Sequence, residues 1–423
     1  MSSESGDQPV ESDEQYNEIL TENHEVLWRE TGEAGPSGYG SAMTEDRAGD
    51  EFEAEDYEQL AAALEPTPGV VGRGELTGEN VYNALAGFQS GDVGAVSGFK
   101  PSGPGHFGHY QTADTLSDLQ EAGVEVYVPV ADTEANYADV DDETIEFMMA
   151  DNLLDWAAAG LNLDQAHVYL QSEEHRLGDI KREMQENITI EDAIEAYGMD
   201  ELDGNFKFLF GGMNQVADLV LPQHPDFDHE YSTMVAGHDQ EGHMKMTMNL
   251  TEPAAEEDDT FVRTVPSSIY NPLIEGLVDV GDDDESSKAS SSEGETSIYV
   301  GPTEEQLSLE ERIDTGLGKL DTAIDEDPEK VERSAQDHLD VLGIEYDDGE
   351  ATDILRQELP EFLEEHRDRR IKVFDYAREK AQGGEPEQPD FWPENGEAQV
   401  PQEERNETEW HEVVAAMDGE VIE

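Results

Sequence analysis

The chain has 423 residues, 36% of them hydrophobic, which favours two or three domains and supplies apolar material for a sizeable core. Its 104 Asp and Glu residues against 23 Lys and Arg residues give a formal net charge of −81. It has no cysteine, which excludes disulfides, zinc–thiolate sites and a cysteine nucleophile within this chain.

The acidic residues are spread along the chain, including segments that carry apolar periodicity. An acidic tail or a disordered activator would instead gather them in blocks that are poor in core-forming residues. In molar salt the Debye length falls to about 3 Å, so self-repulsion within a folded acidic protein is screened. We therefore expect a folded protein that is adapted to high salt.

Neither a membrane span nor an export signal is recognisable. No stretch approaches the roughly 20 apolar residues of a membrane-spanning helix. The first residues, MSSESGDQPVESDEQ, lack the basic start and the apolar core of a signal peptide. We expect a soluble, cytoplasmic protein that does not bind a membrane.

Residues 1–58 are acidic, rich in Gly and Ser and weakly periodic, so we expect a largely disordered extension. From about Val96 the pattern alternates between strand and helix. The predicted elements are a strand in GAVSGF, a helix in TADTLSDLQEAG, a strand over Val124–Asp132, a helix over Asp142–Ala159 and a strand in AHVYLQS. This order predicts the α/β class, with a Rossmann-like parallel-sheet domain over residues 59–303.

The last third of the chain has a helical pattern. Residues 304–383 are predicted to form a C-terminal α-helical bundle domain, with breaks at Asp327-Pro328 and at Gly343. Residues 384–423 are rich in Pro and Glu and are expected to form an acidic tail with a short helix near Trp410 to Met417.

The first candidate site is the run GFKPSGPGHFGH, from Gly98 to His109, between a predicted strand and a predicted helix. Nucleotides bind at this place in α/β sheets, where a strand's carboxyl end faces a helix N-terminus. His106 and His109 can donate hydrogen bonds to phosphate oxygens, and Gly108 lets the backbone approach a ligand closely. A chance match, or a metal-binding pair of histidines, is the alternative interpretation.

The second candidate site is Lys288-Ala-Ser-Ser-Ser292, in a loop almost two hundred residues downstream. A lysine beside hydroxyl groups can stabilise the charge that develops when a triphosphate is attacked. Alone, this segment is more typical of a solvated Ser-rich linker.

Together the two sites resemble the paired ATP-binding motifs of class I aminoacyl-tRNA synthetases, usually written HIGH and KMSKS. Six further blocks, in the same order, resemble the tryptophanyl-tRNA synthetases of archaea, and the acidity suggests a haloarchaeal type. The blocks are VYVPVADTEAN, GLNLDQAHVYLQS, NQVADLVLPQ, AGHDQEGHMK, VPSSIYNPLIEGL and TSIYVGPTEEQ, and they cover about Val96 to Gln306. The resemblance implies ATP-dependent ligation of tryptophan to its tRNA through a tryptophanyl-adenylate.

The same resemblance assigns the ATP site. His106, His109 and Lys288 would be the catalytic residues, acting by positioning and electrostatics. The ATP-binding residues would be Ser102, Gly103, Gly108, Asp239, Ser290, Ser291 and Ser292. Mg²⁺ would travel with ATP as its complex, so no protein-held metal is expected.

The amino-acid and RNA sites also follow from the resemblance. Glu134, Gln215 and Gln240 would face the amino acid, with Glu134 accepting from the indole N–H, which can only donate. Asp218 is ambiguous, because an aspartate near this position would bind the phenol hydroxyl in a tyrosine enzyme.

A basic run on the last long helix is expected to bind tRNA(Trp), through Arg367, Arg370 and Lys372. A salt-bridged solvated face, with Glu364 and Glu365 as partners, is the alternative. The family implies a homodimer.

Departures from the family pattern keep other functions open. Ala289 replaces the methionine of the second motif, acidic residues lengthen the loop before Lys288, and Lys245 replaces an arginine, which is not a neutral change. The alternatives are a tyrosyl-tRNA synthetase and a degenerate paralogue that binds without ligating. A nucleotidyltransferase with the first motif is a third, disfavoured by the helical C-terminal region.

Overall fold

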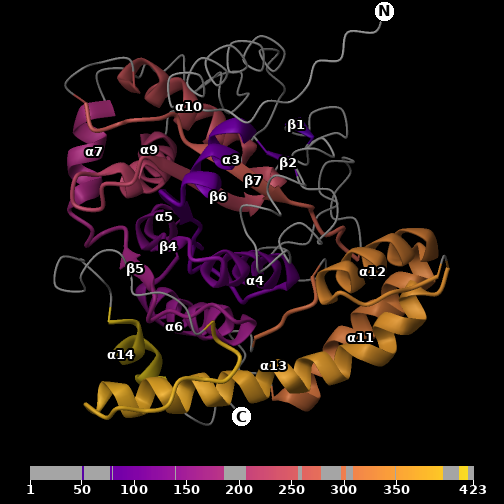
Figure 1. Cartoon of the computed structure of the whole chain (residues 1–423). Coiled ribbons are helices and arrows are strands. Elements are labelled where there is room, and N and C mark those ends of the chain that lie inside the picture. The colour runs from indigo at the N-terminus through magenta and orange to yellow at the C-terminus, as the bar shows by residue number, and fades with distance from the viewer. Residues whose placement is uncertain are drawn as a thin grey trace, which may run out of the picture.

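The computed structural model describes residues 50–51, 77–78, 80–138, 140–184, 206–255, 260–277, 297–301, 308–347, 349–393 and 409–417. Within them the strands form a seven-stranded sheet in the order β1-β2-β7-β6-β3-β4-β5 (Figure 1). Five of them run parallel: β3 (Val93–Val96), β4 (Glu125–Val130), β5 (Ala166–Leu170), β6 (Tyr231–Gly237) and β7 (Ser267–Asn271). The predicted Rossmann-like parallel sheet is confirmed.

Two short strands extend the sheet at the β7 edge. β1 (Asp50–Glu51) pairs with β2 (Thr77–Gly78), and β2 pairs with β7, both antiparallel. Two residues of the predicted 1–58 extension therefore belong to the sheet, and the rest of that extension lies outside the described residues.

Helices cover both faces of the sheet. Side chains alternate between the faces along each strand, so Val126 and Val128 join one core while Tyr127 joins the other. The first core lies under α3 (Val81–Ser90), α4 (Phe107–Glu121) and α6 (Asp142–Ala159). The second lies under α7 (Arg176–Met184), α9 (Phe206–Val220) and α10 (Glu241–Ala255). The bounds of α6 are those predicted, because Asp141 caps its first turn through the Thr144 amide at 3.0 Å.

The predicted helical bundle consists of α11 (Leu309–Glu326), α12 (Pro328–Leu342) and α13 (Ala351–Ala381). Both predicted breaks are confirmed: Asp327 caps α12 ahead of Pro328, and Gly343 ends it with a φ of 67°. Figure 1 shows α13 running along one side of the molecule, with α11 and α12 near one end and α14 (Trp410–Ala415) near the other. Among the described residues, no helix has the length and apolarity to cross a membrane.

The bundle and the C-terminal segment pack directly on the sheet domain. Phe107 of α4 is fully buried in the core formed by α11, α12 and α13. Trp392 and Trp410 join the core under α6, and the Trp392 Nε1–H donates to the Ala157 carbonyl at 2.8 Å. The short helix predicted near Trp410 is confirmed, and it lies against α6 and α13.

Candidate active site

The candidate residues gather at the carboxyl ends of the parallel strands. β3 and β6 are neighbours although far apart in sequence, so the strand order reverses between them, which is where open α/β sheets bind ligands. The His106 turn follows β3, Glu134 follows β4, and Asp239 and Gln240 form the 3-10 helix η4 (His238–Gln240) directly after β6. Residues predicted separately thus share one edge of the sheet.

His106 is the N-cap of α4, and the local backbone fixes its ring. Its Nδ1 accepts from the Gly108 amide at 3.1 Å, so the neutral ring carries its proton on Nε2. A Cβ at position 108 would lie 2.9 Å from Cε1 of His106. The position of the His106 ring therefore requires a glycine at position 108, whether or not a ligand is bound.

His109 lies one turn further along α4, and its ring stacks on that of His106 with centroids 4.2 Å apart. Burial lowers the pKa of His109, and the charges of Asp155 and Asp239 only partly offset this. The helix N-terminus disfavours a positive charge as well. The turn therefore presents two imidazole rings at the N-terminus of a helix, an arrangement that suits a phosphate.

The turn before His106 is held by α6. The Asn152 side chain donates to the Gly103 carbonyl at 3.2 Å, and the Ser102 amide donates to the Lys100 carbonyl at 2.8 Å. Ser102 is half-buried, and its predicted contact with ATP stays a prediction.

Asp239 follows β6 and the two histidines follow β3, so they lie on opposite sides of the point where the strand order reverses. Asp239 acts electrostatically on His109 and on His243, whose pKa burial lowers to about 4. Gln240 donates to Asp239 at 3.0 Å, and both side chains are partly exposed. Asp239, predicted to bind ATP, thus lies within electrostatic reach of His109, and Gln240, predicted to bind the amino acid, lies beside Asp239.

Glu134 lies in a second part of the site, on α5 (Asp132–Tyr137). It is 7% exposed, and its Oε1 has no hydrogen-bond partner among the described residues. Burial raises the pKa of Glu134 to about 7, against the opposing effects of Gln215, Lys100 and Gln171. The structure therefore brings Glu134 and Gln215 together, and the prediction that both face the amino acid stays a prediction.

Gln171, directly after β5, was not singled out from the sequence. Its amide donates to Oδ2 of Asp218 at 2.6 Å, and its oxygen accepts from Thr133 at 2.6 Å. The Tyr169 hydroxyl donates to the other oxygen of Asp218 at 2.9 Å. Burial raises the pKa of Asp218 to about 8. The only sequence signal for Gln171 was its place at the end of the LQS block.

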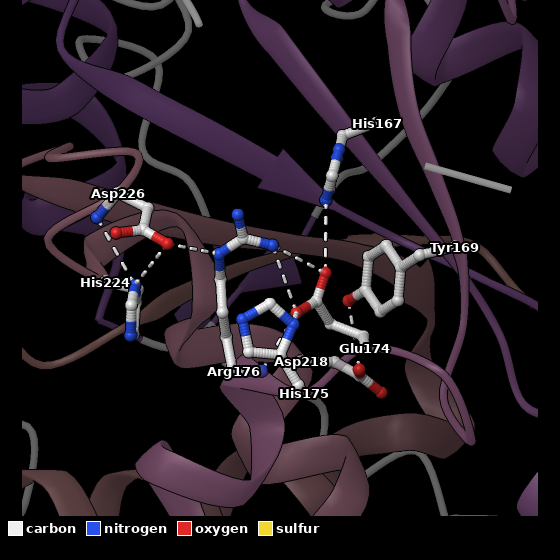
Figure 2. A network of polar contacts seen from close by, with 8 residues as sticks. All are labelled: His167, Tyr169, Glu174, His175, Arg176, Asp218, His224 and Asp226. Carbon is white, nitrogen blue, oxygen red and sulfur yellow. Dashed lines mark hydrogen bonds and ion pairs between the residues drawn. The ribbon is translucent and has the colours of Figure 1, made fainter. Parts of the chain in front are cut away.

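A charged network lies at the start of α7 (Figure 2). Arg176, at the start of α7, binds Glu174 at 3.1 Å and Asp226 at 2.6 Å, and His167 lies 3.6 Å from Glu174. Burial opposes ionisation of Glu174, but His167 and Arg176 outweigh it and lower its pKa. Figure 2 shows the Tyr169–Asp218 pair directly beside this network. The network fixes the start of α7 against the loop after the 3-10 helix η3 (Leu221–Gln223).

Lys288, Ser290, Ser291 and Ser292 lie outside the described residues, and so does Ala289. The chain re-enters the described structure beside the first motif: Tyr299 forms an antiparallel bridge with His106, and the Val300 amide donates to the Gly105 carbonyl at 3.0 Å. The first described residues after Lys288 therefore lie at the His106 turn.

The predicted RNA-binding residues separate into two groups on α13. Arg367 and Lys372 are on the surface, paired with Asp368 at 2.6 Å and with Asp390 at 2.9 Å. Arg370 is 0% exposed and binds Asp151 and Asp155 of α6. The expectation that Arg370 contacts RNA is wrong, because it is enclosed between α6 and α13. The alternative of a salt-bridged face is supported by the pair of Arg369 with Glu365 at 2.8 Å.

Comparison with known families agrees with this geometry. A family model described as "tRNA synthetases class I (W and Y)" matches residues 89–309, more than half of the chain. The chain belongs to this family of class I tRNA synthetases. The part matched to class I synthetases begins at the end of α3, contains β3 to β7 and both candidate motifs, and ends at the first residue of α11.

In the relatives, the matched region is only part of the chain. A tryptophan–tRNA ligase from Methanocaldococcus jannaschii is 29% identical over 230 residues, which are 52% of this chain and 58% of the relative. One from Methanopyrus kandleri is 31% identical over 248 residues, which are 57% of this chain and 62% of the relative. The chain thus spans about three fifths of the length of these two relatives.

A solved structure extends the likeness to most of the chain. The crystal structure of tryptophanyl-tRNA synthetase from the hyperthermophilic archaeon Aeropyrum pernix K1 matches 84% of this chain and 95% of its own, with a TM-score of 0.62 and 22% identity. At this identity the match shows that the fold is shared. Among the described residues, no group of three or more His, Asp and Glu side chains is placed to hold a metal ion.

Proposed function

We propose that this class I synthetase ligates tryptophan to tRNA(Trp). In the first step a carboxylate oxygen of tryptophan attacks the α-phosphorus of ATP, the bond to the β-phosphate breaks, and pyrophosphate leaves. In the second step a ribose hydroxyl at the 3′ end of tRNA attacks the acyl carbon, and AMP leaves. The relatives named above are tryptophan–tRNA ligases, which supports the assignment.

The choice of tryptophan over tyrosine rests on how the carboxylates of Glu134 and Asp218 are hydrogen-bonded. The indole nitrogen can only donate, and Oε1 of Glu134 is a buried acceptor without a donor among the described residues. A donor arriving there would relieve the cost of leaving that oxygen unpaired. Both oxygens of Asp218, in contrast, already accept hydrogen bonds. A phenol hydroxyl would have to share these oxygens with Tyr169 and Gln171.

The ATP site is proposed to form around His106 and His109. Their rings and the first amides of α4 would hold the phosphates of MgATP, which enters as a substrate complex. Lys288 with Ser290 to Ser292 would stabilise the leaving pyrophosphate. Ser102, Gly103 and Asp239 would complete the site, with Gln215 and Gln240 on the amino acid.

RNA binding is proposed to use Arg367 and Lys372, without Arg370. These two cations already pair with acids, so their contacts with RNA would exchange one anion for another. With a net charge of −81, binding requires salt that screens the repulsion. We infer a haloarchaeal, cytoplasmic homodimer from the composition and the family.

Two alternative functions within the family can be distinguished by the product that each forms or fails to form. A tyrosyl-tRNA synthetase would activate tyrosine at the same site. A degenerate paralogue would bind tryptophan or tRNA without making an adenylate, and Ala289 is the residue that suggests it.

The test is ATP–pyrophosphate exchange in multimolar KCl with tryptophan or tyrosine, followed by charging of tRNA(Trp). We expect exchange with tryptophan alone and charging of its tRNA. Exchange with tyrosine alone would establish the tyrosyl alternative. A folded protein that gives no exchange with either amino acid, yet binds tryptophan, would establish the degenerate paralogue.

A further inference from the structure

A buried polar face of α6 lies between the nucleotide-binding turn and the helical bundle. Asp151 and Asp155 are one turn apart and are both fully enclosed. Oδ1 of Asp155 accepts from Nε2 of His366 at 3.0 Å and from Arg370, and Arg370 also donates to Asp151 at 2.6 Å. A bidentate arginine holds two carboxylates of one helix in a fixed geometry.

The other oxygen of Asp155 faces the nucleotide-binding turn. A Cβ at Gly105 or at Gly301 would overlap Oδ2 of Asp155, so this carboxylate lies against the backbone of both residues. These two segments are joined by the hydrogen bond from the Val300 amide to the Gly105 carbonyl at 3.0 Å. On the bundle side, Arg312 of α11 donates to the Val300 carbonyl at 2.9 Å. One carboxylate thus contacts α13 and both segments that flank His106.

The aromatic side chains of the first motif also connect the His106 turn to the helical bundle. Phe107 packs on His338 of α12 and Phe362 of α13, with centroids 4.6 Å and 5.0 Å away. Tyr110 packs on Phe362 at 5.2 Å. The turn therefore has its histidines at the site and its aromatic side chains in the bundle.

We propose that Asp155, held by Arg370 and His366, is a positioning residue that makes the placement of His106 depend on the docking of α13. A change that loosens α13 would then weaken ATP binding while leaving the proposed tryptophan site intact, because the hydrogen bonds of Gln171 and Asp218 within the described residues are with α5, β5 and α9. The structural part of this inference is independent of the proposed function, and its kinetic part rests on it.

The test compares Arg370→Lys and Asp155→Asn with Arg369→Lys, a control at the next position on α13 whose partner is the exposed Glu365. Arg370→Lys keeps the charge but loses the fork that reaches both carboxylates. We expect both test variants to raise amide hydrogen exchange in residues 104–110 and 299–301 at least tenfold. The control should stay within twofold of the wild type.

The kinetic arm measures KM for ATP and for tryptophan in pyrophosphate exchange. We expect the KM for ATP to rise at least tenfold in both test variants, while the KM for tryptophan stays within twofold. Equal rises in both KM values, or hydrogen exchange that rises equally throughout the sheet, would mean general destabilisation and would overturn the proposal. If the wild type itself gives no pyrophosphate exchange, the proposed function fails, and the hydrogen-exchange arm still decides the coupling.

Discussion

Gln171 donates to Oδ2 of Asp218 across 2.6 Å, and this contact joins the end of β5 to α9. With Tyr169 on its other oxygen, each oxygen of Asp218 already accepts one hydrogen bond. Glu134, close to the same glutamine, keeps one buried oxygen without a donor among the described residues. Among the described residues, Glu134 therefore has the unsatisfied buried acceptor and Asp218 does not.

The proposed role of Glu134 predicts that its removal lowers kcat/KM only for an amino acid that carries the indole N–H. Replacing Glu134 by Leu removes a charge-assisted hydrogen bond, which is worth about 1.5–3 kcal/mol, or roughly 10- to 150-fold in kcat/KM. An analogue with sulfur in place of the indole N–H should lose a similar factor in the wild type and almost nothing further in the variant. Pyrophosphate exchange with both amino acids, in both proteins, measures this coupling.

Asp179→Asn is the matched control, because Asp179 is an exposed acid on α7 that pairs only with its neighbour Arg182 in the described structure. It should leave both amino acids unaffected. If the analogue and tryptophan differ as much in Glu134→Leu as in the wild type, Glu134 does not bind the indole nitrogen.

The two buried carboxyls predict a pH dependence of stability. The pKa of Asp218 is raised from 3.8 to about 8, so the folded protein holds this proton more tightly than the unfolded chain does. Its contribution to the free energy of unfolding is fully present below about pH 4 and is lost as the pH rises through about 8. Glu134, with its pKa raised to about 7, acts in the same direction.

Denaturant unfolding at constant high salt should therefore show stability falling between about pH 5 and pH 8. Asp218→Asn, which mimics the protonated carboxyl, should flatten this slope, while Asp390→Asn, at an exposed surface acid, should keep it. An unchanged slope in Asp218→Asn would mean that Asp218 is ionised in the folded protein at low pH.

Gly108 predicts a steric effect on the nucleotide site. Gly108→Ala places a methyl group 2.9 Å from Cε1 of His106, so the ring must move out of its hydrogen bond with the amide of residue 108. We expect the KM for ATP to rise about tenfold or more, equivalent to about 1.4 kcal/mol, with the fold retained.

Gly178→Ala is the control for Gly108→Ala. Gly178 lies within α7, and a Cβ there meets no atom within 4 Å. The change should leave the KM for ATP unaltered and should stabilise the helix by about 0.5–1 kcal/mol. A wild-type KM for ATP in Gly108→Ala would show that the position of His106 is not needed for binding.

The sequence predicted a parallel sheet with strands at β3, β4 and β5, the bounds of α6 and the breaks on either side of α12, because these follow from periodicity and caps. It did not predict β6 and β7 as strands, and it placed the start of α4 at Thr112 where the structure has Phe107. It did not predict which arginine of the basic run is buried. Leu355, Leu359, Phe362, His366, Arg370 and Val373 recur every three or four residues along α13, so the apolar stripe passes through His366 and Arg370. The stripe was visible in the sequence, but its acidic partners lie 215 and 219 residues away.

Gln171 was missed for a related reason. Its functional importance depends on three contacts, with Asp218, Thr133 and Glu134, that come from separate elements of the chain. A single glutamine after a strand gives no local signal. Only the fold brings the ends of β4 and β5 to the same side of α9.

The charge of −81 predicts that stability depends on screening. Lowering KCl from molar concentration to 0.1 M lengthens the Debye length from about 3 Å to about 10 Å, so repulsion between distant carboxylates returns. We expect the midpoint of thermal unfolding to fall steadily with salt concentration. Sucrose at low salt is the matched test, since it favours burial of apolar surface without screening charge. If sucrose restored the midpoint as fully as KCl does, the salt requirement would come from the hydrophobic cores and the acidic surface would not be its cause. We expect KCl to restore the midpoint and sucrose to recover only part of it, because the acids lie throughout the sheet domain and the bundle.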